Sequence, residues 1–202
     1  MKHIAVMGSG NGSNFEAIVK WFQDKSVEIT CLSDVEDAFI LKRAQNLRIN
    51  HQFLPFEQNF EYFSKNEFDL VVLAGYMKII PENVLKAMGK VINIHPSLLP
   101  AFKGKDAVKK AFLAGVKVSG VTVHYVDCNI DTGKIIAQYP VFIDNSMHFD
   151  EFEAEIHEIE HRLYPIVIEK VLEDKIFDFH DLMKSGCSKN KEGGGCDRCG
   201  QH

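Results

Sequence analysis

The chain has 202 residues, of which 46% are hydrophobic and 25% charged, a composition that is ordinary for a globular protein with one sizeable core. Its formal net charge of −5 and pI near 6.0 argue against broad electrostatic binding of nucleic acid. No apolar run approaches the roughly 18 residues that a membrane-spanning helix needs, and no signal peptide precedes the first expected strand. We therefore expect a cytoplasmic protein that binds neither nucleic acid nor membranes.

The apolar segments alternate between strand and helix patterns along the chain. We expect the final helix, which contains Pro165, to be kinked or broken there. The alternation predicts an α/β fold of the Rossmann-like, doubly wound class, with a mostly parallel sheet, helices on both faces and a C-terminal antiparallel strand. Strands are expected over residues 2–7, 27–32, 49–54, 70–74, 91–95, 118–126 and 135–141, and the main helices over 15–22, 38–47, 59–65 and 148–172.

The first turn, residues 8–14, reads Gly-Ser-Gly-Asn-Gly-Ser-Asn and has the composition of an anion-binding loop. Its glycines let the backbone approach a ligand, and a helix that starts there leaves N–H groups free at the positive end of its dipole. The spacing does not fit the dinucleotide fingerprint, and the P-loop lysine is absent. The pattern favours a phosphate monoester over a dinucleotide, and a tight turn without a ligand remains the alternative.

A second polar cluster interrupts the apolar segments near residue 95. Asn93 and His95 are two residues apart, so they share one face of a strand, and Pro96 ends that strand beside them. Asp131 lies in a turn between the last two expected strands. If those strands lie beside the strand that ends at His95, the three side chains meet and form a general acid/base or oxyanion-stabilising set.

Four motifs together resemble the folate-dependent formyltransferases. They are GNGSN at 10–14, LAGYMKI at 73–79, NIHPSLLP at 93–100, and GVTVHYV at 120–126 with Asp-Thr-Gly at 131–133. The likeness covers roughly residues 2 to 175 in the expected order, and the first motif narrows it to the phosphoribosylglycinamide formyltransferase family. It implies transfer of the formyl group of 10-formyltetrahydrofolate to the amine of glycinamide ribonucleotide in purine (IMP) biosynthesis, a reaction that requires no metal. The sequence leaves open whether the protein is a monomer or a homodimer.

The resemblance also implies roles for individual residues. Asn93 and His95 match groups that stabilise the oxyanion, and Asp131 matches the carboxylate that orients His95 and assists proton transfer. The ribonucleotide site corresponds to Gly12, Ser13, Asn14 and Glu160, and the folate pocket to Met77, Lys78, Ile79, Ile80, Val126 and Asp127. For the apolar members of the pocket, core packing is the alternative. The arginine that family members often place near the folate glutamate is missing between residues 54 and 68.

From residue 185 the composition changes to glycine, lysine and cysteine, so we expect a formyltransferase domain over 1–184 and a tail over 185–202. Four potential ligands stand in this tail, the number that a structural zinc takes, although their spacing is irregular. A tail with reactive thiols, and a redox pair or another metal, remain open. The four potential ligands are Cys187, Cys196, Cys199 and His202.

Other enzymes share the expected catalytic residues. Formyltetrahydrofolate hydrolase and methionyl-tRNA formyltransferase are disfavoured, because a chain of 202 residues has no room for the regulatory domain or RNA-contacting barrel expected of them. Sugar-amine formyltransferases are not expected to carry the first motif. Outside the enzymes, the alternative is a non-catalytic ligand or metal sensor, which has no need of a convergent Asn, His and Asp.

Overall fold

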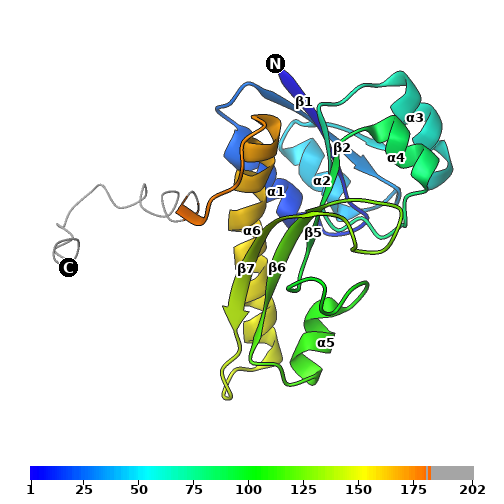
Figure 1. The fold of residues 1–202 in the computed structure, drawn as a ribbon. Coiled ribbons are helices and arrows are strands. Elements are labelled where there is room, and N and C mark those ends of the chain that lie inside the picture. Colours follow the sequence, from blue (N-terminus) through cyan, green and yellow to red (C-terminus); the bar gives the residue numbers. More distant parts are fainter. Residues whose placement is uncertain (181, 183–202) are drawn as a thin grey trace, which may run out of the picture.

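In the computed structural model, which describes residues 1–180 and 182, the apolar runs form a seven-stranded sheet in the order β3-β2-β1-β4-β5-β6-β7 (Figure 1). The first five strands are parallel, and β6 runs antiparallel to both β5 and β7. The expected Rossmann-like α/β class, with its antiparallel strand near the C-terminus, is confirmed. The strands are β1 Lys2–Met7, β2 Val27–Ser33, β3 Asn50–Phe53, β4 Leu70–Leu73, β5 Val91–His95, β6 Val118–Tyr125 and β7 Ile135–Phe142.

Helices follow most of the strands, as the sequence pattern predicts. None of them, within the described part of the chain, combines the length and apolarity needed to cross a membrane. They are α1 Ser13–Phe22, α2 Phe39–Asn46, α3 Asn59–Lys65 after the short 3₁₀ helix η1 Phe56–Gln58, α4 Glu82–Met88, α5 Ala107–Leu113 and α6 Phe149–Leu172.

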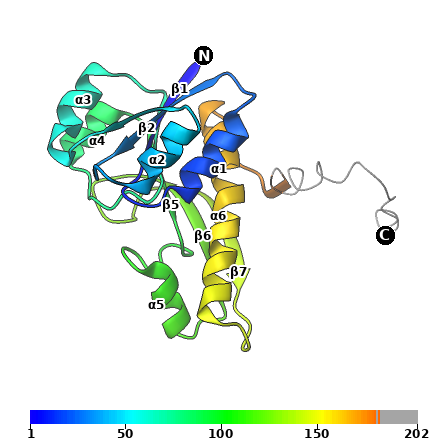
Figure 2. The ribbon, with the colours of Figure 1, turned by 180° about the vertical axis from the view of Figure 1, so that it is seen from behind.

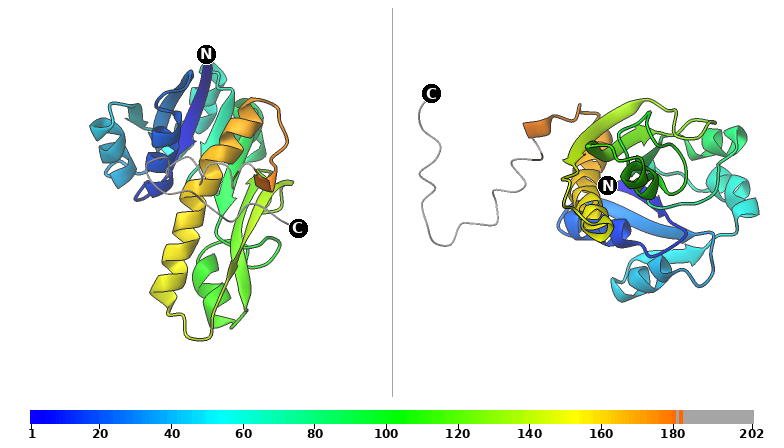
Figure 3. Two further views of the ribbon diagram at one scale, coloured as in Figure 1. Left: turned by 90° about the vertical axis from the view of Figure 1, so that its left-hand side faces the viewer. Right: turned by 90° about the horizontal axis from the view of Figure 1, so that it is seen from below.

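The central strands are buried on both faces, and their successive side chains point alternately into two apolar clusters. In β1, Ile4 and Val6 join the apolar cluster under α1, α2 and α6, whereas Ala5 and Met7 join the cluster under α3 and α4 (Figure 2). The long strands β6 and β7 extend beyond the parallel strands together with the N-terminal half of α6 (Figure 3). The parallel part of the sheet therefore has one layer of helices on each face.

Of the two outcomes expected at Pro165, the break is wrong, because α6 runs without interruption through this residue. Pro165 removes one helical hydrogen bond, but the helix is buried on both sides of it. The fully buried Tyr164 donates its hydroxyl to the backbone oxygens of Leu73, at 2.8 Å, and of Ile92, at 3.2 Å. Packing and these two hydrogen bonds hold the helix on the ends of β4 and β5.

We expect Tyr164→Phe to lower the free energy of unfolding by about 1–2 kcal/mol, because two buried carbonyl oxygens lose a donor while the ring still fills its place. Urea denaturation of the two proteins measures the difference. Tyr139→Phe is the matched control, since the Tyr139 hydroxyl on β7 has no hydrogen-bond partner among residues 1–180 and 182. Equal losses in the two variants would contradict this account of α6.

Candidate functional site

Strand β5 presents Asn93 and His95 on the same side of the sheet. Ile92 and Ile94 alternate with them and enter the apolar cluster under α6, so the two polar side chains point to the other face. His95 is the last residue of the strand and only 5% exposed. Its Nε2 lies 2.9 Å from the carbonyl oxygen of Phe102, which can only accept, so Nε2–H donates there and Nδ1 is left for another group.

His124 is a site residue that the sequence reasoning missed. The register of β5 and β6 pairs Asn93 directly with His124, and side chains directly opposite in an antiparallel pair share one face. Asn93 Nδ2 lies 3.3 Å from His124 Nε2, while His124 Nδ1 lies 2.8 Å from the carbonyl oxygen of Tyr125. Nδ1–H therefore donates to that carbonyl, and Nε2 faces the Asn93 amide. His124 stands in one of the sequence motifs, but its pairing partner is set by the strand register.

Asp131 reaches the same point from the loop between β6 and β7. Its carboxylate lies 3.4 Å from His95 Nδ1 and 3.6 Å from His124 Nε2. Its backbone is left-handed, with φ of 49°, and its Oδ2 accepts a 2.8 Å hydrogen bond from the backbone N–H of Gly104. The structure thus brings Asn93, His95 and Asp131 together, although Asn93 and His95 come from strand β5 and Asp131 from the loop after β6.

The electrostatics of this cluster favour an ionised Asp131. Burial alone raises the pKa of a carboxyl, but the neighbouring His124 ring, the Gly104 N–H and the charge of His95 lower the pKa of Asp131 to about 2. A carboxylate therefore faces Nδ1 of His95 at neutral pH. A proton that arrives on Nδ1 would be stabilised by that carboxylate, which is the geometry of a proton-accepting pair.

The glycine-rich loop and α6 form a second polar group. Gly12 caps α1 in the left-handed region, with φ of 78°, and a Cβ there would come within 2.6 Å of Ile40. Asn14 Nδ2 donates to Glu160 Oε2 at 3.2 Å, and His157 Nδ1 lies 3.0 Å from the same oxygen. The hydrogen bond with the Glu160 carboxylate raises the pKa of His157. The loop residue Asn14 and the helix residue Glu160 are therefore in direct contact.

The residues expected in the folate pocket are divided between surface and core. Met77 and Ile79 are 70% and 62% exposed just after β4, whereas Ile80 is 4% exposed and packs in the apolar cluster under α3 and α4. Lys78 is exposed, Val126 packs against that cluster, and Asp127 accepts hydrogen bonds within its own loop. Only part of the expected set therefore faces solvent beside the carboxyl ends of the strands.

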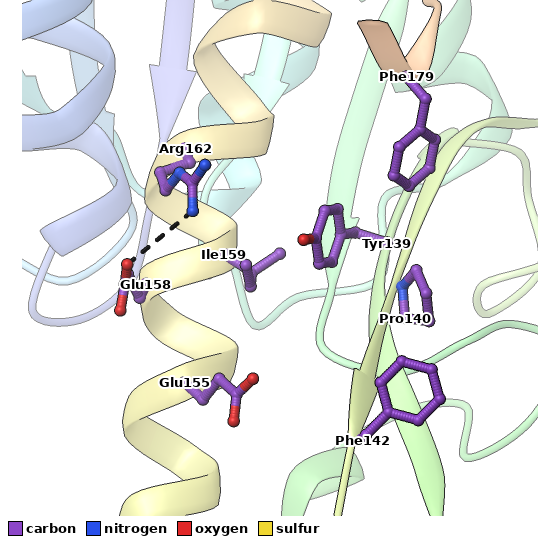
Figure 4. A pocket seen from close by; sticks show the side chains of 8 residues that line it. All are labelled: Tyr139, Pro140, Phe142, Glu155, Glu158, Ile159, Arg162 and Phe179. Carbon is purple, nitrogen blue, oxygen red and sulfur yellow. Dashed lines mark ion pairs between the residues drawn. The ribbon is translucent and has the colours of Figure 1, made fainter. Parts of the chain in front are cut away.

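A cavity of about 350 Å³ lies elsewhere, between α6 and the edge strand β7 (Figure 4). None of the expected site residues lines it. An ion pair between Arg162 and Glu158, with 4.0 Å between its closest atoms, flanks it on the helix side. Its lining residues are Tyr139, Pro140, Phe142, Glu155, Glu158, Ile159, Arg162 and Phe179.

The potential zinc ligands Cys187, Cys196, Cys199 and His202 lie outside the described residues. Within the described part of the chain, no group of three or more His, Cys, Asp or Glu side chains is arranged to hold a metal ion. Its two cysteines are free thiols, one buried at Cys31 and one exposed at Cys128.

The low pKa of Asp131 leads to a pH prediction. Because the folded value, about 2, is below the ordinary 3.8, the carboxylate contributes stability that is present above pH 3.8 and is lost as the pH falls towards 2. We expect the stability advantage of the wild type over Asp131→Asn to shrink by about 2 kcal/mol across this window. Urea denaturation at a series of pH values measures it, and a constant difference between the two proteins would contradict the assignment.

Comparison with known proteins identifies the family of this chain. Residues 2–168 match the family model described as formyl transferase. A phosphoribosylglycinamide formyltransferase of Bacillus subtilis is 46% identical over 186 residues, which cover 85% of this chain and 95% of that protein.

Solved structures are equally similar. The phosphoribosylglycinamide formyltransferase of Streptococcus pneumoniae is 42% identical with a TM-score of 0.78, over 85% of this chain and 99% of the other. That of Bacillus halodurans is 37% identical with a TM-score of 0.79, over 85% and 95%. The chain therefore belongs to the formyl transferase family and groups within it with the phosphoribosylglycinamide formyltransferases.

Proposed function

We propose that this protein transfers the formyl group of 10-formyltetrahydrofolate to the primary amine of glycinamide ribonucleotide, as a cytoplasmic step of purine biosynthesis. The observation that carries the proposal is the contact of Asp131 with His95 beside Asn93, in a chain of the formyl transferase family. Its partners are then these two small molecules, and the active form is a monomer or a homodimer.

The arrangement suits the charges that develop during this reaction. When the amine attacks the formyl carbon, a C–N bond forms, the carbonyl oxygen becomes negative and the nitrogen becomes positive. Asn93 and a protonated His95 stabilise the oxyanion. Asp131, held against His95 Nδ1, assists removal of the ammonium proton. As the bond between the formyl carbon and N10 of the folate breaks, that nitrogen receives a proton, so the transfer is balanced without a metal.

The ribonucleotide is assigned to the glycine-rich loop and α6. Gly12, Ser13 and Asn14 surround the N-terminus of α1, where free N–H groups suit a phosphate. Asn14 Oδ1 is buried without a donor among the described residues, and a hydroxyl group of the ligand would supply one. Glu160, which accepts from Asn14, can accept from a ribose hydroxyl as well.

The folate co-substrate is assigned to the segment that follows β4 and to the loop that follows β6. The exposed side chains of Met77 and Ile79 offer an apolar surface to its rings. The remaining members of this pocket are Lys78, Ile80, Val126 and Asp127, of which Ile80 acts from the core. We assign all of this machinery to a domain over residues 1–184, followed by the tail 185–202.

A formyl-transfer assay with purified protein tests the function. We expect turnover with glycinamide ribonucleotide, and kcat lower by on the order of 10²- to 10³-fold in His95→Ala and in Asp131→Asn. His180→Ala is the control, because His180 forms an exposed ion pair with Asp178. Release of formate without an acceptor would instead identify a hydrolase, and transfer only to an amino sugar would identify a sugar-amine enzyme.

We propose further that the tail binds one structural zinc ion through Cys187, Cys196, Cys199 and His202, a set that suits tetrahedral coordination. Metal analysis of the full chain is expected to find about one zinc per protein. Cys196→Ser should lower this content to background without changing kcat, whereas the control Cys128→Ser should retain the metal. A full chain that contains no zinc and binds none would leave the reactive-thiol alternative.

A further inference from the structure

The middle of the glycine-rich loop is held by α2. The backbone N–H of Ile40 donates to Gly10 O at 3.0 Å, and the Ile40 side chain fills the space beside Gly12. One turn further along α2, Arg43 donates from Nε to Asn11 O at 2.9 Å and from Nη2 to Asn11 Oδ1 at 3.1 Å. These two hydrogen bonds from the planar guanidinium group of Arg43 fix the orientation of Asn11.

These contacts determine where the loop N–H groups point. The carbonyl oxygens of Gly10 and Asn11 both point towards α2. In a trans peptide the N–H lies opposite the C=O, so the N–H groups of Asn11 and Gly12 point away from α2. Neither has an acceptor among residues 1–180 and 182. Successive N–H groups on one side of a loop form a concave donor set for an anion, here next to the free N–H groups of α1.

Arg43 also compensates a charge that opposes an anion. Glu16 lies in the first turn of α1; Arg43 Nη1 pairs with its Oε2, and Lys20 Nζ lies 2.6 Å from its Oε1. The hydrogen bond from Lys20 and the charges of Lys20 and Arg43 keep the pKa of Glu16 low. The carboxylate is therefore ionised at neutral pH, and it would repel a phosphate at the start of the helix.

We propose that Arg43 is a positioning residue for the substrate phosphate: from α2 it turns the Asn11 and Gly12 N–H groups outwards and offsets the negative charge of Glu16. Three of its five N–H groups donate to Asn11 and Glu16, and the role assigned to Arg43 is exerted through these contacts with the loop and the helix. The inference rests on the proposed function, because the phosphate is that of glycinamide ribonucleotide.

Steady-state kinetics with two acceptors, glycinamide ribonucleotide and its phosphate-free riboside, tests the proposal. Arg43→Lys keeps the charge but loses the planar fork, and Arg43→Gln loses the charge. We expect each to raise KM for the ribonucleotide by about 10-fold, with kcat and KM for the folate within about 2-fold of wild type. The riboside should be used with unchanged kcat/KM. Arg48→Lys, an exposed arginine just after α2, is the matched control.

A second substitution measures how much of the KM effect comes from the charge of Arg43. Adding Glu16→Gln to Arg43→Gln removes the uncompensated carboxylate, and we expect it to recover part of the KM loss. Equal losses of kcat/KM with both acceptors would overturn the proposal, because they would show that Arg43 only supports the fold.

Binding of inorganic phosphate, followed by ³¹P NMR, gives a readout that does not need turnover. Weaker phosphate binding by Arg43→Lys than by wild type supports the role of Arg43. This holds even if wild type fails to use glycinamide ribonucleotide, because that failure would refute the proposed function and not the role of Arg43. Equal affinity, or no binding by wild type, would overturn the role of Arg43.

Discussion

The antiparallel pairing of β6 with β5 is the constraint on which the candidate site depends. In the parallel part of the sheet, neighbouring strands are joined by helical crossovers, and sites form at the carboxyl ends of the strands. Reversal of β6 places His124 opposite Asn93 and lets a short loop carry Asp131 back over the same face. The reversed strand β6 and the loop that follows it therefore bring an imidazole and a carboxylate to the residues at the end of β5.

The same site shows how burial and charge are balanced. Asp131 is largely withdrawn from water, which by itself disfavours its ionised form, yet its pKa is near 2 because two imidazole rings and a backbone N–H surround the carboxylate. The residues nearest to Asp131, including Gly104, are thus part of the electrostatics of the site. Preorganised groups of this kind stabilise developing charge without reorganisation during the reaction.

Much of the fold was predictable, because runs of apolar residues with strand or helix spacing gave the order of elements and placed the polar side chains at strand ends. Three features were not predictable. The register between β5 and β6 places His124 opposite Asn93, and this register cannot be read from the sequence pattern alone. Tertiary packing keeps α6 intact at Pro165, against local propensity. Burial of Ile80 depends on α3 and α4, so a pattern read along one segment cannot separate it from the exposed Ile79.

The hydroxyl of Tyr164 connects the two halves of the proposed chemistry. Tyr164 lies one helical turn after Glu160, so both side chains project from the same side of α6. Its bond to the carbonyl of Ile92 attaches that helix directly to the residue before Asn93. The distance between the Glu160 carboxylate, assigned to the ribose, and the Asn93 amide, assigned to the oxyanion, is therefore set by the packing of α6 on β5. Loops around the candidate site can change in length or sequence without altering that spacing.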